Sequence, residues 1–287
     1  MNYQETAVNF TCRDDSLYGI ASLPAQGAAR GVLVVVGGPQ YRAGSHRQFT
    51  LLARSLAEQG IPAMRFDYRG MGDSGGEPRS FEDVQHDLRA AIDHFLTLVP
   101  GMREVVIWGL CDAASAALFY GASDARVCGL VLLNPWVRTT GGHAKATLKH
   151  YYVDRLLQPA LWRKIASGRF DYRGALRSFT RLLGAARGSA DAPAPEAGEP
   201  ADSCAPLPDR MLAGMTKFKG KVLLILSGRD LTAQEFSDLA KGSPQWQRLL
   251  GASHVTRQAL DEADHTFSRR VWRDQVSGWT GEWVKSW

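Results

Sequence analysis

The sequence predicts an α/β fold in which helices cover both faces of a mostly parallel sheet. Continuous apolar runs rich in β-branched residues are typical of strands buried on both faces of such a sheet. Segments with helical spacing follow these runs, and this alternation favours parallel strands joined by crossover helices. We expect strands within 31–38, 61–70, 104–109, 127–136, 221–230 and 255–267. We expect helices at 49–60, 80–99, 112–122 and 268–287.

The chain of 287 residues is long enough for one large α/β domain with an insertion. We expect the core in two parts, residues 1–137 and 210–287. Residues 138–187 contain helical patterns and no convincing strand, which predicts a helical cap insertion. Residues 188–209 contain five prolines and no aromatic residue, a composition typical of a flexible linker. Within the core, Ser80 with Asp83 three residues later is expected to cap the helix at 80–99.

The net charge of +5 is unevenly distributed. Residues 138–187 hold eleven Lys and Arg against two acids, a local charge of +9. This segment is either a solvated helical face or a basic surface that meets an anionic substrate or membrane. It contains no recognised nucleic-acid-binding motif, so nucleic acid is not an expected partner.

Cysteine spacing and the N-terminal sequence indicate the compartment. Cys12, Cys111, Cys128 and Cys204 have neither disulfide-framework nor zinc-ligand spacing, so we expect reduced thiols, no metal and no cofactor. No apolar stretch is long enough to span a bilayer, and the N-terminus lacks the features of a signal peptide. These features predict a cytoplasmic protein.

Three residues at the expected strand ends have the chemistry of nucleophilic catalysis. Cys111 follows one strand, Asp230 follows a later one, and His265 follows the last. Ligands of open parallel sheets bind beyond the carboxyl ends of the strands. The order nucleophile, acid, histidine is that of hydrolases whose nucleophile sits on a strand–turn–helix elbow. We therefore expect Cys111, Asp230 and His265 to be catalytic, with His265 accepting the thiol proton and Asp230 orienting the imidazole.

Other acids and histidines compete less well for these roles. Asp238, Asp261 and Asp264 are alternatives to Asp230, but Asp264 is adjacent to His265, where the required hydrogen bond is difficult to form. His254 precedes the last strand, which places it at the opposite end of the sheet.

The backbone around the nucleophile is expected to supply the oxyanion hole. One donor is the N–H of Asp112, the residue after the nucleophile, and the other comes from the loop after the first strand. Pro39 in that loop has no N–H, so we expect Gln40 to donate, with Gly38 as second choice. The Asp112 side chain is expected to point away from the site, because its charge would oppose an oxyanion.

Residues beside these elements are candidates for substrate binding. Tyr41, Arg42, His46 and Arg47 could clamp a carboxylate or phosphate, although an exposed loop explains them equally well. Trp136 could line an apolar acyl pocket, together with Tyr151, Tyr152, Trp162 and Phe179 of the expected insertion, or these aromatic residues could form the insertion's own core. We expect Asp67 and Arg69 to brace a glycine-rich turn and not to act in catalysis.

The chain resembles the α/β-hydrolases over nearly its whole length. FDYRGMGDSGG at 66–76 is similar to the Asp-x-Arg-Gly-x-Gly-x-Ser turn common in that superfamily, and a cysteine at the elbow is similar to dienelactone hydrolases and polyester synthases. More narrowly, VVGGPQYRAGSHRQF, FDYRGMGDSGG, WGLCDAAS, LLNPW and ADHTFS together resemble the exosortase A system-associated hydrolase 1 family. That family occurs beside exopolysaccharide and protein-sorting genes.

The resemblance implies a hydrolase or acyltransferase that acts on an ester or thioester. With Cys111 as nucleophile, the acyl-enzyme would be a thioester. The substrate would be a small-molecule, lipid or saccharide acyl compound, including an anionic one. The alternative is a catalytically silent hydrolase-fold protein in which only binding survives, as a scaffold or through the basic insertion.

Overall fold

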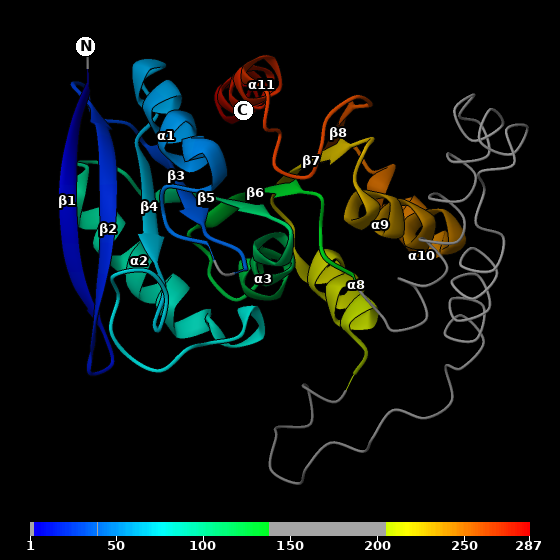
Figure 1. Cartoon of the computed structure of the whole chain (residues 1–287), viewed down its shortest axis with the longest axis horizontal. Helices are drawn as coiled ribbons and strands as arrows, with labels where there is room; N and C mark the ends of the chain where they lie inside the picture. The colour runs from blue at the N-terminus through cyan, green and yellow to red at the C-terminus, as the bar shows by residue number, and fades with distance from the viewer. Residues whose placement is uncertain (1–2, 39, 138–204) are drawn as a thin grey trace, which may run out of the picture.

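The computed structural model describes residues 3–38, 40–137 and 205–287, whose strands form a single sheet. The order across the sheet is β1-β2-β4-β3-β5-β6-β7-β8 (Figure 1). The strands are β1 (Tyr3–Cys12), β2 (Asp15–Pro24), β3 (Arg30–Val35), β4 (Ala63–Asp67), β5 (Glu104–Leu110), β6 (Val127–Leu133), β7 (Lys221–Ser227) and β8 (Val255–Leu260).

The six strands from β4 to β8 across the sheet pair in parallel, and β1 and β2 pair antiparallel at one edge. Parallel strands β3 to β7 are apolar almost throughout and buried on both faces, as their sequences predict. Parallel pairing brings the carboxyl ends of β3, β5, β6, β7 and β8 to one edge. The predicted mostly parallel α/β sheet is therefore confirmed.

Helices cover both faces of the sheet (Figure 1). On one face, α1 (Gln48–Glu58) and α11 (Arg270–Lys285) bury residues such as Phe49 and Trp283 against the strands. On the other face lie α2 (Gln85–Leu98), α3 (Asp112–Gly121), α8 (Leu207–Lys217), α9 (Leu231–Gly242) and α10 (Pro244–Leu250). Each face has one apolar cluster, so the sheet separates two cores.

Several elements differ from the expected pattern. The β1–β2 hairpin was not among the expected strands, although its buried positions at Val8, Phe10 and Cys12 alternate along the strand. Ser80 caps a short 3-10 helix, η2 (Phe81–Asp83), and α2 begins separately at Gln85. Helix α8 (Leu207–Lys217) begins within the last three residues of the expected linker at 188–209, and residues 188–204 of that linker lie outside the described residues. The expected insertion at 138–187 lies outside the described residues.

The turn after β4 is braced by two ion pairs. Arg69 is almost fully buried and donates from Nε and Nη2 to the two oxygens of Asp87 at 3.0 and 2.8 Å. Asp67, also buried, pairs with Arg42 of the loop after β3 and accepts from its backbone N–H at 2.7 Å. The predicted bracing role of Asp67 and Arg69 is confirmed, and the bond to Arg42 also fixes the loop that leads away from β3.

Replacing one member of the buried pair is expected to destabilise the fold strongly. Arg69→Ala leaves the Asp87 carboxylate buried without its partner, which typically costs about 3–5 kcal/mol. Urea denaturation measures this loss. Arg270→Ala is the control, because the Arg270–Asp274 pair is exposed and such pairs contribute at most about 1 kcal/mol. Equal losses in the two variants would contradict this account of the turn.

Candidate active site

Cys111 lies at a sharp turn between β5 and α3. Its backbone has φ 63° and ψ −124°, a conformation that non-glycine residues rarely adopt. Two hydrogen bonds fix the turn to the end of β6: the Cys111 N–H donates to the Leu133 carbonyl at 2.9 Å, and the Trp136 N–H donates to the Cys111 carbonyl at 3.2 Å. The strain is therefore held by the surrounding sheet, as in a nucleophile elbow.

Close packing of α3 against the end of β5 explains the residues around Cys111. A Cβ atom at Gly109 would lie 2.5 Å from the carbonyl oxygen of Ala113, so only glycine fits there. Ala113 itself is buried and is accommodated, which makes its difference from the usual glycine a mild one. The helix thus begins directly after Cys111, and its N-terminal dipole favours an anion there.

His265 and Asp230 come from two neighbouring loops and meet at this edge of the sheet. His265 lies between β8 and α11, and its Nδ1 is 2.8 Å from Oδ2 of Asp230. Asp230 is the N-cap of α9 and also accepts from the N–H groups of Thr232 and Ala233 at 3.1 and 3.2 Å. A carboxylate only accepts hydrogen bonds, so Nδ1 carries a proton and Nε2 is left for another partner.

Cys111 is the second group that acts on this imidazole. Burial lowers the pKa of His265, but hydrogen bonds to Asp230 and Cys111 and the charges of both groups outweigh burial and raise the pKa to about 10. The structure therefore brings Cys111, His265 and Asp230 together in the expected order. This environment favours an imidazolium beside the sulfur.

Asp264 and His254, two of the competing residues, have other positions or partners. Asp264 accepts from the N–H and hydroxyl of Ser268, which closes the turn before α11. His254 precedes β8, and its carbonyl accepts from the N–H of Val222 at the start of β7. His254 is thus at the amino ends of the strands, across the sheet from Cys111.

Asn134, to which sequence reasoning assigned no role, connects the end of β6 to the end of β7 and to the loop of His265. It is fully buried with φ 44° after β6. Its Nδ2 donates to Ser227 Oγ at 2.8 Å and to the His265 carbonyl at 3.2 Å, and its Oδ1 accepts from the Ser227 N–H at 2.9 Å. Its position in the segment Asn134-Pro135-Trp136, directly after a buried strand, is the one signal that could have identified it.

The Asp112 side chain does not point away from the site, and that expectation was wrong. Its Oδ2 accepts from the N–H of Gly38 at 2.8 Å, and its Oδ1 accepts from the N–H of Ala113 at 2.9 Å. Burial raises the pKa of Asp112, although these N–H groups, its own N–H and the charge of His265 act in the opposite direction. The Asp112 carboxylate is therefore hydrogen-bonded to the Gly38 N–H, next to the elbow.

Of the two loop donors expected for an oxyanion, Gly38 is the one whose N–H reaches the elbow. The side-chain oxygen of Gln40 is buried and has no hydrogen-bond partner among the described residues. Gln40 was the expected first donor and Gly38 the second, and of the two it is the Gly38 N–H for which a hydrogen bond beside Cys111 is observed.

The candidate substrate-binding residues separate into three groups. Arg42 pairs with Asp67 and Asp73, and the Tyr41 hydroxyl donates to Asp73 at 3.1 Å, so both hold the loop. Trp136 lies beside the elbow, to which its N–H is bonded.

His46 and Arg47 precede α1 with φ 52° and 59°, and the His46 carbonyl accepts from Arg273 at 3.1 Å. Both residues therefore have a left-handed backbone conformation, in a tight turn that is anchored to α11.

The other thiols in the described part of the chain have surroundings that disfavour the thiolate. Burial raises the pKa of Cys12 and of Cys128. Cys12 is in the hairpin, and the Cys128 thiol donates to the Val105 carbonyl at 3.5 Å near the start of β5. All three described cysteines are free thiols, and Cys204 lies outside the described residues.

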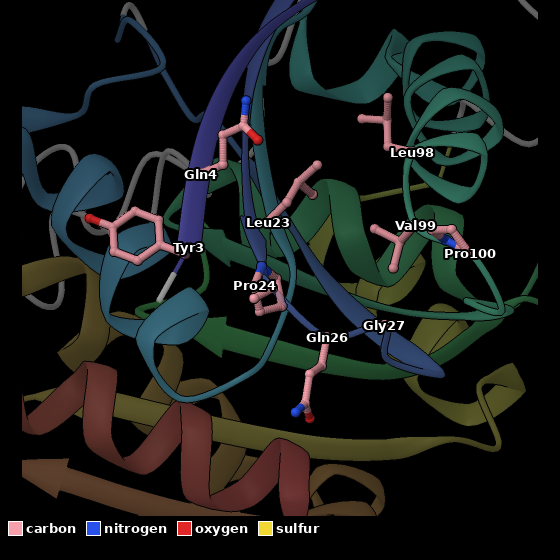
Figure 2. Close-up of a pocket in the computed structure, with 10 residues that line it drawn as sticks. Tyr3, Gln4, Leu23, Pro24, Gln26, Gly27, Leu98, Val99 and Pro100 are labelled. Carbon is pink, nitrogen blue, oxygen red and sulfur yellow. The ribbon is translucent and has the colours of Figure 1, made fainter. Parts of the chain in front are cut away.

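A hollow of about 650 Å³ lies away from these residues (Figure 2). Tyr3 and Pro24 line it on the hairpin side, and Leu98 and Pro100 line it at the end of α2. These segments precede β3 and β5, so the hollow is near the amino ends of the strands. It contributes nothing to the site around Cys111.

The described part of the chain offers neither a metal-binding cluster nor a membrane-spanning helix. Ranges 3–38, 40–137 and 205–287 contain no group of three or more His, Cys, Asp or Glu side chains placed to hold a metal ion. No helix in those ranges is long and apolar enough to cross a membrane.

A strained strand–turn–helix elbow with a His–Asp pair at the carboxyl edge of a parallel sheet is the arrangement of the α/β-hydrolase class. The model of the Alpha/beta hydrolase family matches residues 32–270, and the chain belongs to that family.

Similar proteins include enzymes of several kinds. The polyketide transferase grgF of Penicillium sp. is 32% identical over 98 residues, which are 31% of this chain and 32% of that protein. The chain therefore matches about a third of that relative's length. The esterase Pf2001 of Pyrococcus furiosus has a similar structure, with a TM-score of 0.65, 17% identity, and coverage of 99% of this chain and 93% of that one. The dienelactone hydrolase of Anabaena variabilis gives a TM-score of 0.59 with 16% identity, covering 99% and 98%. At these identities the two structures support the fold.

The raised pKa of His265 predicts a pH-dependent contribution to stability. Because folding raises this pKa from 6.5 to about 10, the contribution is complete below pH 6.5 and is lost as pH rises through about 10. We expect the difference in unfolding free energy between the wild-type protein and His265→Gln to decrease over that range in denaturation at a series of pH values. Asp230→Asn removes a group that raises the pKa and should reduce the trend. A difference that is constant across this range would refute the assignment.

Proposed function

We propose that the protein is a cysteine-dependent hydrolase or acyltransferase that acts on an ester or thioester. The observation that carries the proposal is the 2.8 Å contact of His265 with Asp230 at the edge of the sheet where Cys111 lies on a strained turn at a helix N-terminus. The pKa of His265, raised by Asp230 and Cys111, is consistent with it. A nucleophile, a base and a group that orients the base are the parts that covalent acyl transfer needs.

The proposed reaction has two steps. The Cys111 sulfur attacks the acyl carbonyl, and the tetrahedral intermediate collapses to a thioester as the leaving alcohol or thiol takes a proton from His265. An acceptor then gives a proton to His265 and attacks the thioester, which releases the acyl product and regenerates the sulfur nucleophile. Asp230 stabilises the imidazolium in both steps. The oxyanion of each intermediate would be bound by the N–H groups of Asp112 and Gly38.

The identity of the acceptor decides between hydrolysis and transfer. A thioester acylates amines, thiols and activated hydroxyls more readily than water, which favours transfer. The similar Penicillium protein is named as a transferase, which also favours transfer over hydrolysis. The proposed acyl substrate is a small-molecule, lipid or saccharide compound, including an anionic one.

The narrower assignment to the exosortase A system-associated hydrolase 1 family is also a proposal. It is supported by the segments VVGGPQYRAGSHRQF, WGLCDAAS and ADHTFS, which contain the oxyanion loop, the elbow and the histidine loop. We further propose a cytoplasmic location, because a nucleophilic thiol needs a reducing compartment.

A catalytically silent binding protein is the second candidate. The observation in its favour is the carboxylate of Asp112 on the Gly38 N–H, because a resident negative charge opposes an oxyanion. Iodoacetamide labelling followed by peptide mapping separates the two candidates. Selective labelling of Cys111 that is lost in His265→Gln supports the enzyme, and labelling that is independent of His265 supports the silent protein.

Removal of the Cys111 thiol tests the proposed chemistry. Cys111→Ala is expected to reduce turnover of a p-nitrophenyl or acyl-CoA test ester by at least ~10³-fold, as for other nucleophile deletions. Cys12→Ala and Cys128→Ala are matched controls and should retain turnover, because their thiols lie elsewhere in the fold. Release of p-nitrophenolate or of free CoA thiol measures the rates. Activity that survives in Cys111→Ala would refute the assignment.

A further inference from the structure

The Asp112 carboxylate occupies the backbone donors that an oxyanion would need. Gly38 N–H donates to Oδ2 at 2.8 Å, and the N–H of Asp112 itself also stabilises the charged carboxylate. These are the two N–H groups to which the proposed mechanism assigns the oxyanion. The Ala113 N–H holds the other carboxylate oxygen at 2.9 Å.

The loop after β3 has the shape that this carboxylate requires. A Cβ atom at Gly37 would lie 2.2 Å from Oδ1 of Asp112 and 2.7 Å from the Leu110 carbonyl. Gly38 follows with φ 56°, a left-handed backbone that suits glycine. The two glycines therefore allow the loop to approach the carboxylate closely.

The surroundings stabilise the carboxylate only in part. Burial raises its pKa, which means that desolvation disfavours the charge. The charged or titratable groups that act on it are His265, whose charge favours the carboxylate, and Tyr68 at the end of β4. Burial and the charges of Asp112 and Asp87 raise the pKa of Tyr68 to about 12. Because burial disfavours the charged Asp112 carboxylate, it is suited to displacement from the Gly38 N–H by another hydrogen-bond acceptor.

We propose that Asp112 determines specificity by competing with the substrate for the oxyanion hole. This inference rests on the proposed function. In the free protein the Asp112 carboxylate accepts the hydrogen bond of the Gly38 N–H, and an acyl carbonyl reacts only after it displaces the carboxylate from that N–H. Acyl donors that bind well enough to displace the carboxylate are selected, and simple esters react slowly.

Two reagents distinguish the oxyanion hole from the nucleophile. Acylation by p-nitrophenyl acetate passes through a tetrahedral oxyanion, whereas alkylation by iodoacetamide is a displacement at carbon that forms none. The ratio of the acylation rate constant to the alkylation rate constant at Cys111 therefore measures the contribution of the oxyanion hole. A change in the nucleophilicity of the sulfur affects both rate constants and cancels in the ratio. A purely structural role of Asp112 would not change this ratio.

Substitution of Asp112 is expected to increase the acylation-to-alkylation ratio. Asp112→Ala frees the Gly38 N–H, and because one oxyanion donor is worth ~10²–10³ in rate, we expect an increase of at least ~10-fold. Asp112→Asn keeps the size and removes the charge, and it should give a smaller increase. The control is Asp274→Ala, which removes a carboxylate on α11 far along the chain from the elbow and should leave the ratio unchanged.

The outcomes separate this inference from the proposed function. His265-dependent alkylation of Cys111 verifies that each variant is folded, and Asp112→Asn carries the test if Asp112→Ala does not fold. A ratio that is unchanged or lower in the folded variants overturns the inference while the nucleophile stands. Absence of His265-dependent alkylation in the wild-type protein overturns the proposed function, and this inference with it.

Discussion

The close contact between the end of β5 and the first turn of α3 is the constraint on which the site depends. Because Gly109 has no side chain, the helix begins directly beneath the strand, and Cys111 is forced to φ 63°. The same turn directs the Asp112 side chain toward the loop after β3, where Gly37 and Gly38 leave room for it. One backbone turn thus presents the sulfur and places a carboxylate beside it.

The acid–base pair depends on a second set of contacts. Asp230 is held as a helix N-cap, and Asn134 connects the ends of β6 and β7 to the carbonyl of His265. The imidazole is oriented by groups from three different strand ends, each buried or half-buried. Such preorganisation allows an imidazolium to persist next to the sulfur, because its partners are in place before any substrate binds.

Sequence patterns predicted the parts of the molecule that depend on local chemistry. The buried strands are continuous apolar runs, and their ends carry Cys111, Asp230 and His265 in an order that few arrangements share. The β1–β2 hairpin was missed, although its alternation at Val8 and Phe10 is the usual period of a half-buried strand.

Other features depend on contacts between distant segments. The direction of the Asp112 side chain follows from the approach of a loop 74 residues away, and no local pattern reports it. The role of Asn134 likewise requires β6, β7 and the loop of His265 to be neighbours. The break at Val84, which separates η2 from α2, leaves Ser80 as the cap of only a short helix.

The central claim is that Cys111 carries an acyl group as a thioester. The most direct measurement is intact-mass spectrometry of the wild-type protein after a brief reaction with an acyl-CoA or p-nitrophenyl ester, followed by peptide mapping. The account predicts an adduct of the acyl mass on Cys111 that hydroxylamine removes. An adduct on another residue during turnover, or turnover by a protein that never carries one at Cys111, would contradict it.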